Sequence, residues 1–243
     1  VSAPHPWSPD DPYLYRVDIT LRSHDTIMDA RSERIGFVHF EGKDGRFLIN
    51  GEPYYMRGTG DFISCPETGS PDTDRNRWIR KLKALRAYGY NMVRCQSHVY
   101  TPEYLDAADE VGLLIQSEMG MLGGWAGASP YHYYYWPMPT PDWRALIKKQ
   151  WDRVVMRDVN HPSANAYCMS NELNFRAYPR TAWQCYHDTK AIKPSAMVIW
   201  TDGQHHSTFP EDFANAEADV DTGAIPLIQH EYRWWSSFPD VRL

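Results

Sequence analysis

Three consecutive stretches decide the fold: Asn91-Met92-Val93-Arg94-Cys95, then Thr101-Pro102-Glu103, and then Leu113-Leu114-Ile115-Gln116 directly after Gly112. The first and last are short, largely apolar runs of the kind that form buried strands in parallel sheets. Between them, Thr101 is a good N-cap with proline at the first helical position, and Gly112 is a good helix stop. The sequence therefore predicts a strand, a helix and a second, parallel strand.

The same alternation continues along the chain. Helices are predicted over 74–88, from Asp142 to 155 and over 181–192, and strands over 166–169, 197–200, 213–216 and 225–229. Counted from Tyr54, these make seven strands and no eighth. An open doubly wound sheet is the rival, but no glycine-rich phosphate turn follows any strand. We therefore predict an α/β fold, a (β/α)₈ TIM barrel whose last βα unit is missing.

The N-terminal residues have a β pattern instead. Apolar and polar side chains alternate from Tyr15 to Leu21, which predicts a strand with one buried face, and a second run from Ile35 to Phe40 follows a charged turn at 29–31. Two strands do not make a stable sheet alone. We expect residues 1–41 to be the end of an immunoglobulin-like β-sandwich and residues 42–243 to be the incomplete barrel. Asn50-Gly51 predicts a hairpin turn at the start of the barrel part.

Composition excludes some partners. The formal net charge of −6 argues against nucleic acid, and no stretch has the ~20 apolar residues of a membrane span. Val1 is not a start residue and no signal peptide is visible, so the chain looks cut from a longer one and its localisation stays open. The four cysteines have no paired spacing, which predicts buried free thiols. A homo-oligomer remains open.

Polar residues gather at the ends of the predicted strands, where TIM barrels carry their reactive groups. Two of them, Glu172 and Glu231, suit glycoside cleavage, which needs one carboxylic acid for the leaving oxygen and a carboxylate on the other face of the sugar. The alternative for each is a buried ion pair. The remaining strand-end residues that we expect in one pocket are Arg94, His98, Glu118, Asn171, Asp202 and His230.

Several motifs resemble glycoside hydrolase family 2, the family of β-galactosidases and β-glucuronidases. They are Trp7-Ser8-Pro9-Asp10, Phe47-Leu48-Ile49-Asn50-Gly51, Met56-Arg57-Gly58, Asn91-Met92-Val93-Arg94, Arg157-Asp158-Val159-Asn160-His161-Pro162-Ser163, Ser170-Asn171-Glu172 and His230-Glu231-Tyr232, in the family's order. The resemblance implies a retaining exo-β-glycosidase, with Glu172 as acid/base and Glu231 as nucleophile. It also implies that Asn171 binds the sugar's 2-hydroxyl, that Arg94 and His98 shape the subsite for the non-reducing sugar, and that Glu118 hydrogen-bonds near it. The alternative for these last three is a structural ion pair or a hydrogen-bonded strand end.

The chain departs from the family pattern after the first strand, where Thr59-Gly60-Asp61-Phe62 stands, so Asp61 is expected to replace a usual sugar contact. Trp200 and Tyr232 complete the predicted substrate-binding residues. The chemistry requires no cofactor, and no cluster has metal-ligand spacing, although some relatives bind Mg²⁺ or Na⁺. The expected substrate is an oligosaccharide or glycoside, most simply a β-galactoside. A β-glucuronide, another β-glycoside and a carbohydrate-binding scaffold without turnover are the alternatives.

Overall fold

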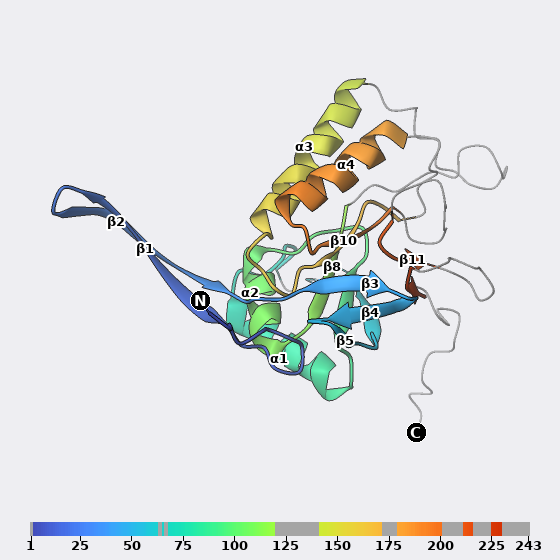
Figure 1. The fold of residues 1–243 in the computed structure, drawn as a ribbon, viewed down its shortest axis with the longest axis horizontal. Coiled ribbons are helices and arrows are strands. Elements are labelled where there is room, and N and C mark those ends of the chain that lie inside the picture. Colours follow the sequence, from blue (N-terminus) through green and yellow to red (C-terminus); the bar gives the residue numbers. More distant parts are fainter. Residues whose placement is uncertain are drawn as a thin grey trace.

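The computed structural model describes residues 2–62, 65, 68–119, 141–171, 179–200, 211–215 and 225–229 (Figure 1). A parallel sheet of five strands lies at its centre, in the order β10-β9-β8-β7-β6. These strands are β6 (Gly58–Asp61), β7 (Met92–Cys95), β8 (Leu114–Glu118), β9 (Ala166–Cys168) and β10 (Met197–Ile199). Each successive strand joins the edge beside its predecessor, as in a barrel with right-handed βα units.

Four helices follow or separate these strands: α1 (Arg75–Ala87), α2 (Pro102–Val111), α3 (Pro141–Arg157) and α4 (Pro179–Ile192). All four lie where the sequence predicts helices. Thr101 is the N-cap of α2 with extended backbone, and Gly112 ends that helix with a left-handed φ of 80°, although the Thr101 side chain makes no capping hydrogen bond. The helix predicted over 74–88 ends at Ala87, and Tyr88 follows it as the C-cap residue, 84% exposed.

Alternation along the strands separates two cores. Met92, Leu114 and Cys168 face the barrel interior, in one cluster with Phe40 and Phe47. Val93, Cys95 and Ile115 face the opposite way, against α1 and α2. Tyr167, Met169 and Val198 do the same against α3 and α4. The side of the sheet that a strand residue faces is therefore fixed by its parity.

The first and last strands of the predicted series differ in detail. The first barrel strand is β6, which pairs with β7, and not the run from Tyr54. Tyr54 instead follows β5 (Glu52–Pro53), which pairs antiparallel with β4 (Arg46–Ile49), and Tyr54 N donates to Phe47 O of β4. The sixth and seventh predicted strands are found as β11 (Ala214–Asn215) and β12 (Leu227–Ile228), a short parallel pair. The residues just before β11 lie beside β10, since Asp212 N donates to Val198 O and Val198 N donates to Asp212 Oδ2.

A small antiparallel sheet closes one end of the barrel interior. It consists of β3 (Phe40–Lys43), β4 and β5. Asn50 and Gly51 join β4 to β5 with φ values of 53° and 86°, as the Asn-Gly turn requires. Phe40, Phe47 and Ile49 fill the end of the interior, where Phe47 packs edge-to-face on Phe213.

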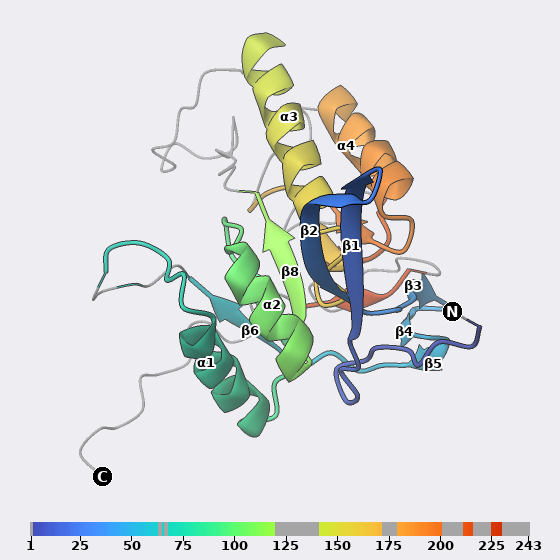
Figure 2. The same cartoon turned by 90° about the vertical axis from the view of Figure 1, so that its left-hand side faces the viewer.

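A long hairpin precedes the barrel and projects away from it (Figures 1 and 2). It pairs β1 (Tyr15–Ser23) with β2 (Thr26–Ile35) around a tight turn at His24 and Asp25. The predicted turn at 29–31 is wrong, because these residues lie within β2. Ile19, Leu21 and Met28 are 54%, 63% and 62% exposed, so no described residue covers the apolar face of this hairpin. The predicted buried face of a β-sandwich stays a prediction.

The segment before the hairpin is anchored in the barrel. Trp7 is fully buried, and its Nε1 donates to Asp109 O at 2.8 Å. Asn50, which follows β4, also contacts this segment, since its Nδ2 donates to Trp7 O. The boundary between residues 1–41 and 42–243 stays a prediction, but these two parts share one core.

Two further predictions concern composition. Cys95, Cys168 and Cys185 are buried free thiols as predicted, whereas Cys65 is free but partly exposed. Within the described part of the chain, no helix has the length and apolar character needed to cross a bilayer.

Candidate active site

Arg94 and Glu118 form a buried ion pair at the carboxyl ends of β7 and β8. Arg94 Nε donates to Glu118 Oε2 at 2.9 Å, and the two side chains are 6% and 0% exposed. Arg94 faces the interior because it lies in register with Gln116 and Gly60 on that face. A buried guanidinium and carboxylate persist only when each has its partner, so this pair fixes the position of both groups.

The loop after β7 supplies a second contact to Glu118. Ser97 N donates to Glu118 Oε1 at 2.8 Å, and Glu118 N donates to His98 O at 3.1 Å. Ser97 has a left-handed φ of 57°, which is uncommon for a residue other than glycine. Such a conformation costs about 1–3 kcal/mol and persists where neighbouring contacts hold it. The Glu118 carboxylate is therefore engaged on both oxygens, beneath the loop that carries His98.

Asn171 joins this network from the end of β9. Arg94 Nη2 donates to Asn171 Oδ1 at 2.7 Å, and Asn171 is 8% exposed. Because the amide oxygen accepts this bond, the amide of Asn171 presents Nδ2 as its donor group. Three of the predicted site residues, Arg94, Glu118 and Asn171, thus lie together at neighbouring strand ends.

His98 is held beside them in a defined tautomer. Its Nδ1 lies 2.8 Å from Gln96 O, which can only accept, so Nδ1 carries the proton. Its Nε2 is buried and has no hydrogen-bond partner among the described residues. Burial lowers the pKa of His98 below its ordinary value, which keeps the imidazole neutral and Nε2 an acceptor.

Asp61 does not join this group. It lies in register with Cys95, so its side chain faces α1 and α2 rather than the interior. There it pairs with Lys81 Nζ at 2.7 Å and accepts from Tyr104 OH at 3.1 Å. These contacts support a structural role for Asp61, and Gly60 occupies the interior position beside Arg94.

Trp200 also lies on the helix side of the sheet. It is 2% exposed and packs in the cluster that includes Trp151 and Ala182. Five further predicted residues, among them both carboxylates, lie outside the described residues, as does the aromatic stretch 120–140. They are Glu172, Asp202, His230, Glu231 and Tyr232.

A cavity of about 1150 Å³ opens between β6 and β12, and Arg94 is part of its lining. Its other lining residues include Tyr54, Gly58 and Met92, which lie toward the opposite ends of the strands. Substrates of TIM-barrel enzymes bind at the carboxyl ends of the strands. We therefore place the candidate site above Arg94, at the end marked by Asn171, and not in this cavity.

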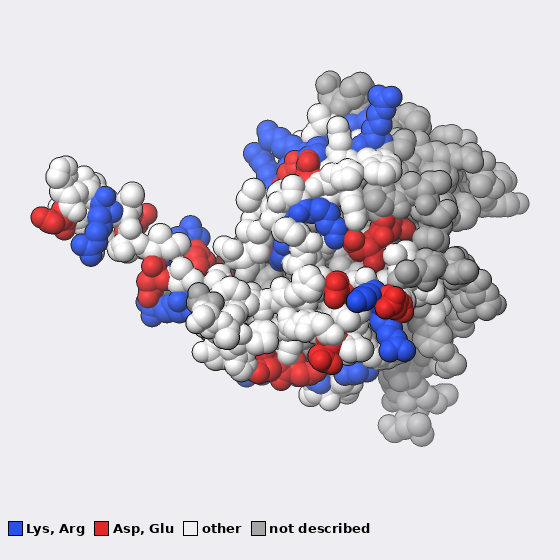
Figure 3. Space-filling view, in the orientation of Figure 1, with Lys and Arg blue, Asp and Glu red and all other residues white. Residues whose placement is uncertain are grey.

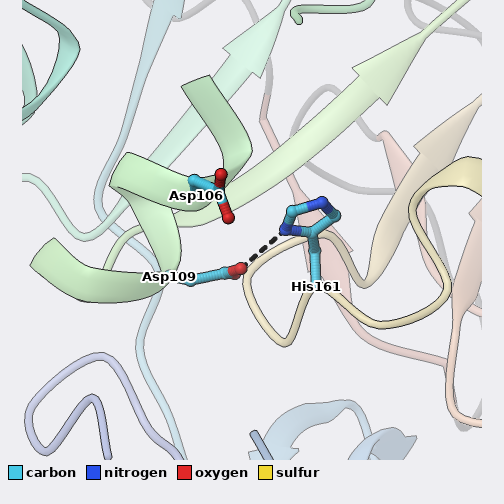
Figure 4. A group of neighbouring side chains, drawn as sticks. All are labelled: Asp106, Asp109 and His161. Carbon is cyan, nitrogen blue, oxygen red and sulfur yellow. Dashed lines mark hydrogen bonds and ion pairs between the residues drawn. The ribbon is translucent and has the colours of Figure 1, made fainter. Parts of the chain in front are cut away.

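Among the described residues, one cluster has side chains that could hold a metal ion. Carboxylate and imidazole atoms of Asp106, Asp109 and His161 lie within 4.8 Å of one another (Figure 4). Asp109 already binds His161 Nδ1 at 2.6 Å and Ser163 N at 2.9 Å, and Asp106 lies 3.4 Å from Arg34. The Asp109–His161 pair joins α2 to the loop before β9, so we describe the cluster as structural.

Parallel βα units with a buried polar network at the strand ends define a TIM-barrel domain with a strand-end site. Residues 40–237 match the model of the glycosyl hydrolases family 2 TIM barrel domain, and residues 1–37 match the glycosyl hydrolases family 2 model. The chain belongs to glycosyl hydrolase family 2. This confirms the resemblance seen in the motifs and the predicted barrel.

Individual relatives are distant. A β-galactosidase of Photobacterium profundum is 26% identical over 247 residues, which cover 99% of this chain and 23% of that protein. A β-galactosidase of Thermoanaerobacter pseudethanolicus is 32% identical over 65% of this chain and 20% of its own length. The chain thus spans less than a quarter of the length of these two relatives.

Solved structures show the same fold. A β-D-glucuronidase of Dictyoglomus thermophilum superposes with a TM-score of 0.67 at 24% identity, covering 82% of this chain and 34% of that one. A β-glucuronidase of Ruminococcus gnavus, in complex with a C6-substituted uronic isofagomine, gives 0.69 at 21% identity, covering 82% and 33%.

Proposed function

We propose that the chain is the catalytic part of a retaining exo-β-glycosidase. The observation that carries the proposal is the anchored amide of Asn171. Its oxygen is held by the buried Arg94, it offers an N–H donor at the strand ends, and Glu172 is the next residue. A family 2 barrel with this arrangement is suited to bind a sugar hydroxyl next to a carboxylic acid.

In the proposed reaction, Glu172 protonates the glycosidic oxygen of the leaving group while Glu231 attacks the anomeric carbon. The resulting glycosyl ester on Glu231 is hydrolysed by water, from which Glu172 now removes a proton. Retention requires the two carboxyl groups to lie about 5–5.5 Å apart, whereas about 6.5 Å or more would favour inversion.

The described residues have supporting roles in this proposal. Asn171 donates to the 2-hydroxyl of the sugar, a bond that strengthens as positive charge develops on the ring. Arg94 positions Asn171, and Glu118 positions Arg94 without reaching the sugar itself. His98, neutral at physiological pH, shapes the subsite through the ring that it places above Glu118, since its Nε2 is buried.

The sugar is proposed to be a β-galactoside, because the two sequence relatives described above are named β-galactosidases. The structural neighbours named β-glucuronidases make a β-glucuronide the second candidate. Aryl β-galactoside, β-glucuronide, β-mannoside and α-L-arabinopyranoside, each offered to the full-length protein, will distinguish them by kcat/KM.

A fluorinated slow substrate of the preferred sugar tests the mechanism. Intact mass should rise by one glycosyl unit, and peptide mapping should place the label on Glu231. Labelling of another residue contradicts the assignment of the nucleophile. If calorimetry detects sugar binding but no aryl glycoside is hydrolysed, the protein is a carbohydrate-binding scaffold and the proposal fails.

A further inference from the structure

A basic groove runs between the N-terminal halves of α3 and α4. It has a volume of about 620 Å³, and among the described residues its charged lining consists of five basic residues and one acidic residue. The whole chain has the opposite balance, with 25 basic and 31 acidic residues. Several Lys and Arg side chains are visible on the surface of this helix pair (Figure 3). The charged lining residues are Arg144, Lys148, Lys149, Asp152, Arg153 and Arg180.

Most of this positive charge is not neutralised by the described protein. Lys148 pairs with Asp152 at 2.5 Å and also with Asp188. Lys149, Arg153 and Arg180 make no hydrogen bond or ion pair within the described part of the chain. The stretch 120–140, which leads into α3, contains no Asp or Glu at all.

The arrangement is electrostatically unfavourable when the groove holds no anion. Lys149 and Arg153 are one helical turn apart, a spacing at which like charges destabilise a helix. Arg180 lies in the first turn of α4, which has no acidic residue there, so it opposes the helix dipole. A bound anion would remove both penalties.

The basic groove lies on the same face of the barrel as the candidate site. α3 follows β8 and α4 follows β9, so their N-terminal ends adjoin the carboxyl ends of those strands. Ala182 of α4 packs in one cluster with Met169 and Trp200, just beyond the ends of β9 and β10. Arg180 is nine residues from Asn171, which limits their separation to roughly 30 Å.

The excess charge is confined to this end of the helix pair. An adjoining cavity of about 580 Å³, toward the C-terminal ends of α3 and α4, has two basic and two acidic lining residues, Arg153, Arg157, Asp152 and Asp188. A general basic coating for solubility would not stop halfway along the groove. The gradient points toward a ligand that approaches the strand-end face.

We infer that the basic groove binds the carboxylate or sulfate groups of an anionic saccharide chain whose terminal sugar enters the candidate site. The inference rests on the proposed glycosidase function. Arg153 and Arg180 suit such a ligand, because planar guanidinium groups bind carboxylates and sulfates through paired N–H donors. The volume is that of a site for a small oligosaccharide segment rather than for a single ion.

Calorimetry on the full-length protein tests the inference, with four probes: tetragalacturonate, a heparin tetrasaccharide, uncharged cellotetraose and pyrophosphate. The groove variant is Lys149→Glu with Arg153→Glu. The matched control is Arg80→Glu with Lys83→Glu on α1, where both side chains are exposed and the change in net charge is identical. Thermal unfolding and aryl glycoside turnover confirm that each variant is folded, and Arg180→Glu alone replaces the groove variant if it is not.

The wild type should bind at least one anionic tetrasaccharide, and the groove variant should bind it at least about tenfold more weakly while the control stays within about twofold. Carboxylated and sulfated probes then identify the anion. Equal weakening by both variants, equal affinity for cellotetraose or pyrophosphate, or no binding at all overturns the inference. If the groove binds but no aryl glycoside is hydrolysed by the wild type, the proposed function fails separately.

Discussion

Arg94 Nη2 lies 2.7 Å from Asn171 Oδ1, although 77 residues separate the two in sequence. The same guanidinium binds Glu118 through Nε, so one side chain links three strand ends. This hydrogen bond fixes the orientation of the Asn171 amide.

Replacing Arg94 by lysine should impair catalysis more than folding. Lysine keeps the charge beside Glu118 but cannot donate to Glu118 and Asn171 in the same planar geometry. We expect kcat/KM to fall about 10²-fold, which corresponds to about 2.7 kcal/mol of lost transition-state stabilisation. Arg46→Lys on the exposed side of β4 is the control. Unchanged kcat/KM in the Arg94 variant would show that Asn171 is positioned without this bond.

Removing the proposed acid/base should produce a variant that added azide rescues. Glu172→Ala cannot protonate the leaving group, so substrates with poor leaving groups should lose about 10²–10⁴-fold in kcat. With an activated aryl glycoside, azide should restore turnover and yield the β-glycosyl azide. Glu103→Ala, at a partly exposed position of α2, should behave as wild type in turnover. A folded Glu172 variant that azide does not rescue contradicts the assignment.

Asp61 should affect stability and not substrate binding. In Asp61→Asn the ion pair with Lys81 is lost, and we expect the free energy of unfolding to fall by about 1–3 kcal/mol at unchanged KM. Lys81→Met should have a similar effect, and the double variant should be less than additive because the two residues form one pair. A tenfold rise in KM for Asp61→Asn, in a protein of normal stability, would instead identify Asp61 as a sugar contact.

The Asp109–His161 pair should make stability depend on pH. Burial alone would lower the pKa of His161, but the hydrogen bond and charge of Asp109 outweigh burial and raise the pKa above its ordinary value. The folded state therefore binds more protons than the unfolded state between those two pKa values. This contribution to stability is complete below about pH 6.5 and is lost as the pH rises through the folded pKa.

Urea unfolding between about pH 5.5 and 8 measures this contribution, with His161→Gln as the comparison. The free energy of unfolding of the wild type should decline toward the upper end of the range more steeply than that of the variant. Parallel pH profiles for the two proteins would mean that the pair contributes nothing to proton linkage.

Lys193 should be among the residues least tolerant of substitution outside the site. Its Nζ donates to the carbonyl oxygens of Asp158, His161 and Ala164 at 3.0, 2.8 and 2.8 Å, and it is 6% exposed. In Lys193→Met these buried carbonyls lose their donor, which should cost about 2–4 kcal/mol. Lys190→Met, whose ion pair with Asp212 is partly exposed, should cost about 1 kcal/mol or less. Equal losses would exclude a special role for the three carbonyls.

The barrel and part of the site could be predicted from sequence because both follow from patterns among residues that are close together in the chain. Strands and helices follow from apolar periodicity, and reactive groups of a barrel follow strand ends, which brought Arg94, Glu118 and Asn171 into the prediction. Their mutual contacts could not be predicted, because they depend on register between strands that are far apart in the chain. The left-handed backbone conformation of Ser97, next to His98, is not indicated by any feature of the sequence.

Two residues predicted as sugar contacts could have been sorted by parity. Asp61 and Trp200 both close a strand, but each lies on the helix side, opposite in parity to Arg94 and to Ile199 respectively. Counting the alternation of side chains along each strand would have assigned Asp61 and Trp200 to the helix side and Arg94 to the interior. The hairpin turn was misplaced because a cluster of charges is not by itself a turn signal: residues 29–31 pair with β1 throughout, and His24 and Asp25 form the turn.

The burial of Trp7 against Asp109 has a consequence for how the protein is made. The Trp7 indole is synthesised about a hundred residues before the Asp109 carbonyl that accepts its hydrogen bond, so it has no native partner until the first two βα units have been made. The N-terminal segment is also packed closely against the barrel. A side chain at Gly112 would collide with Pro9, and one at Gly36 with Pro162. A truncation made at the sequence border near residue 41 would therefore not release an intact barrel, but one with an indole-sized hole in its wall.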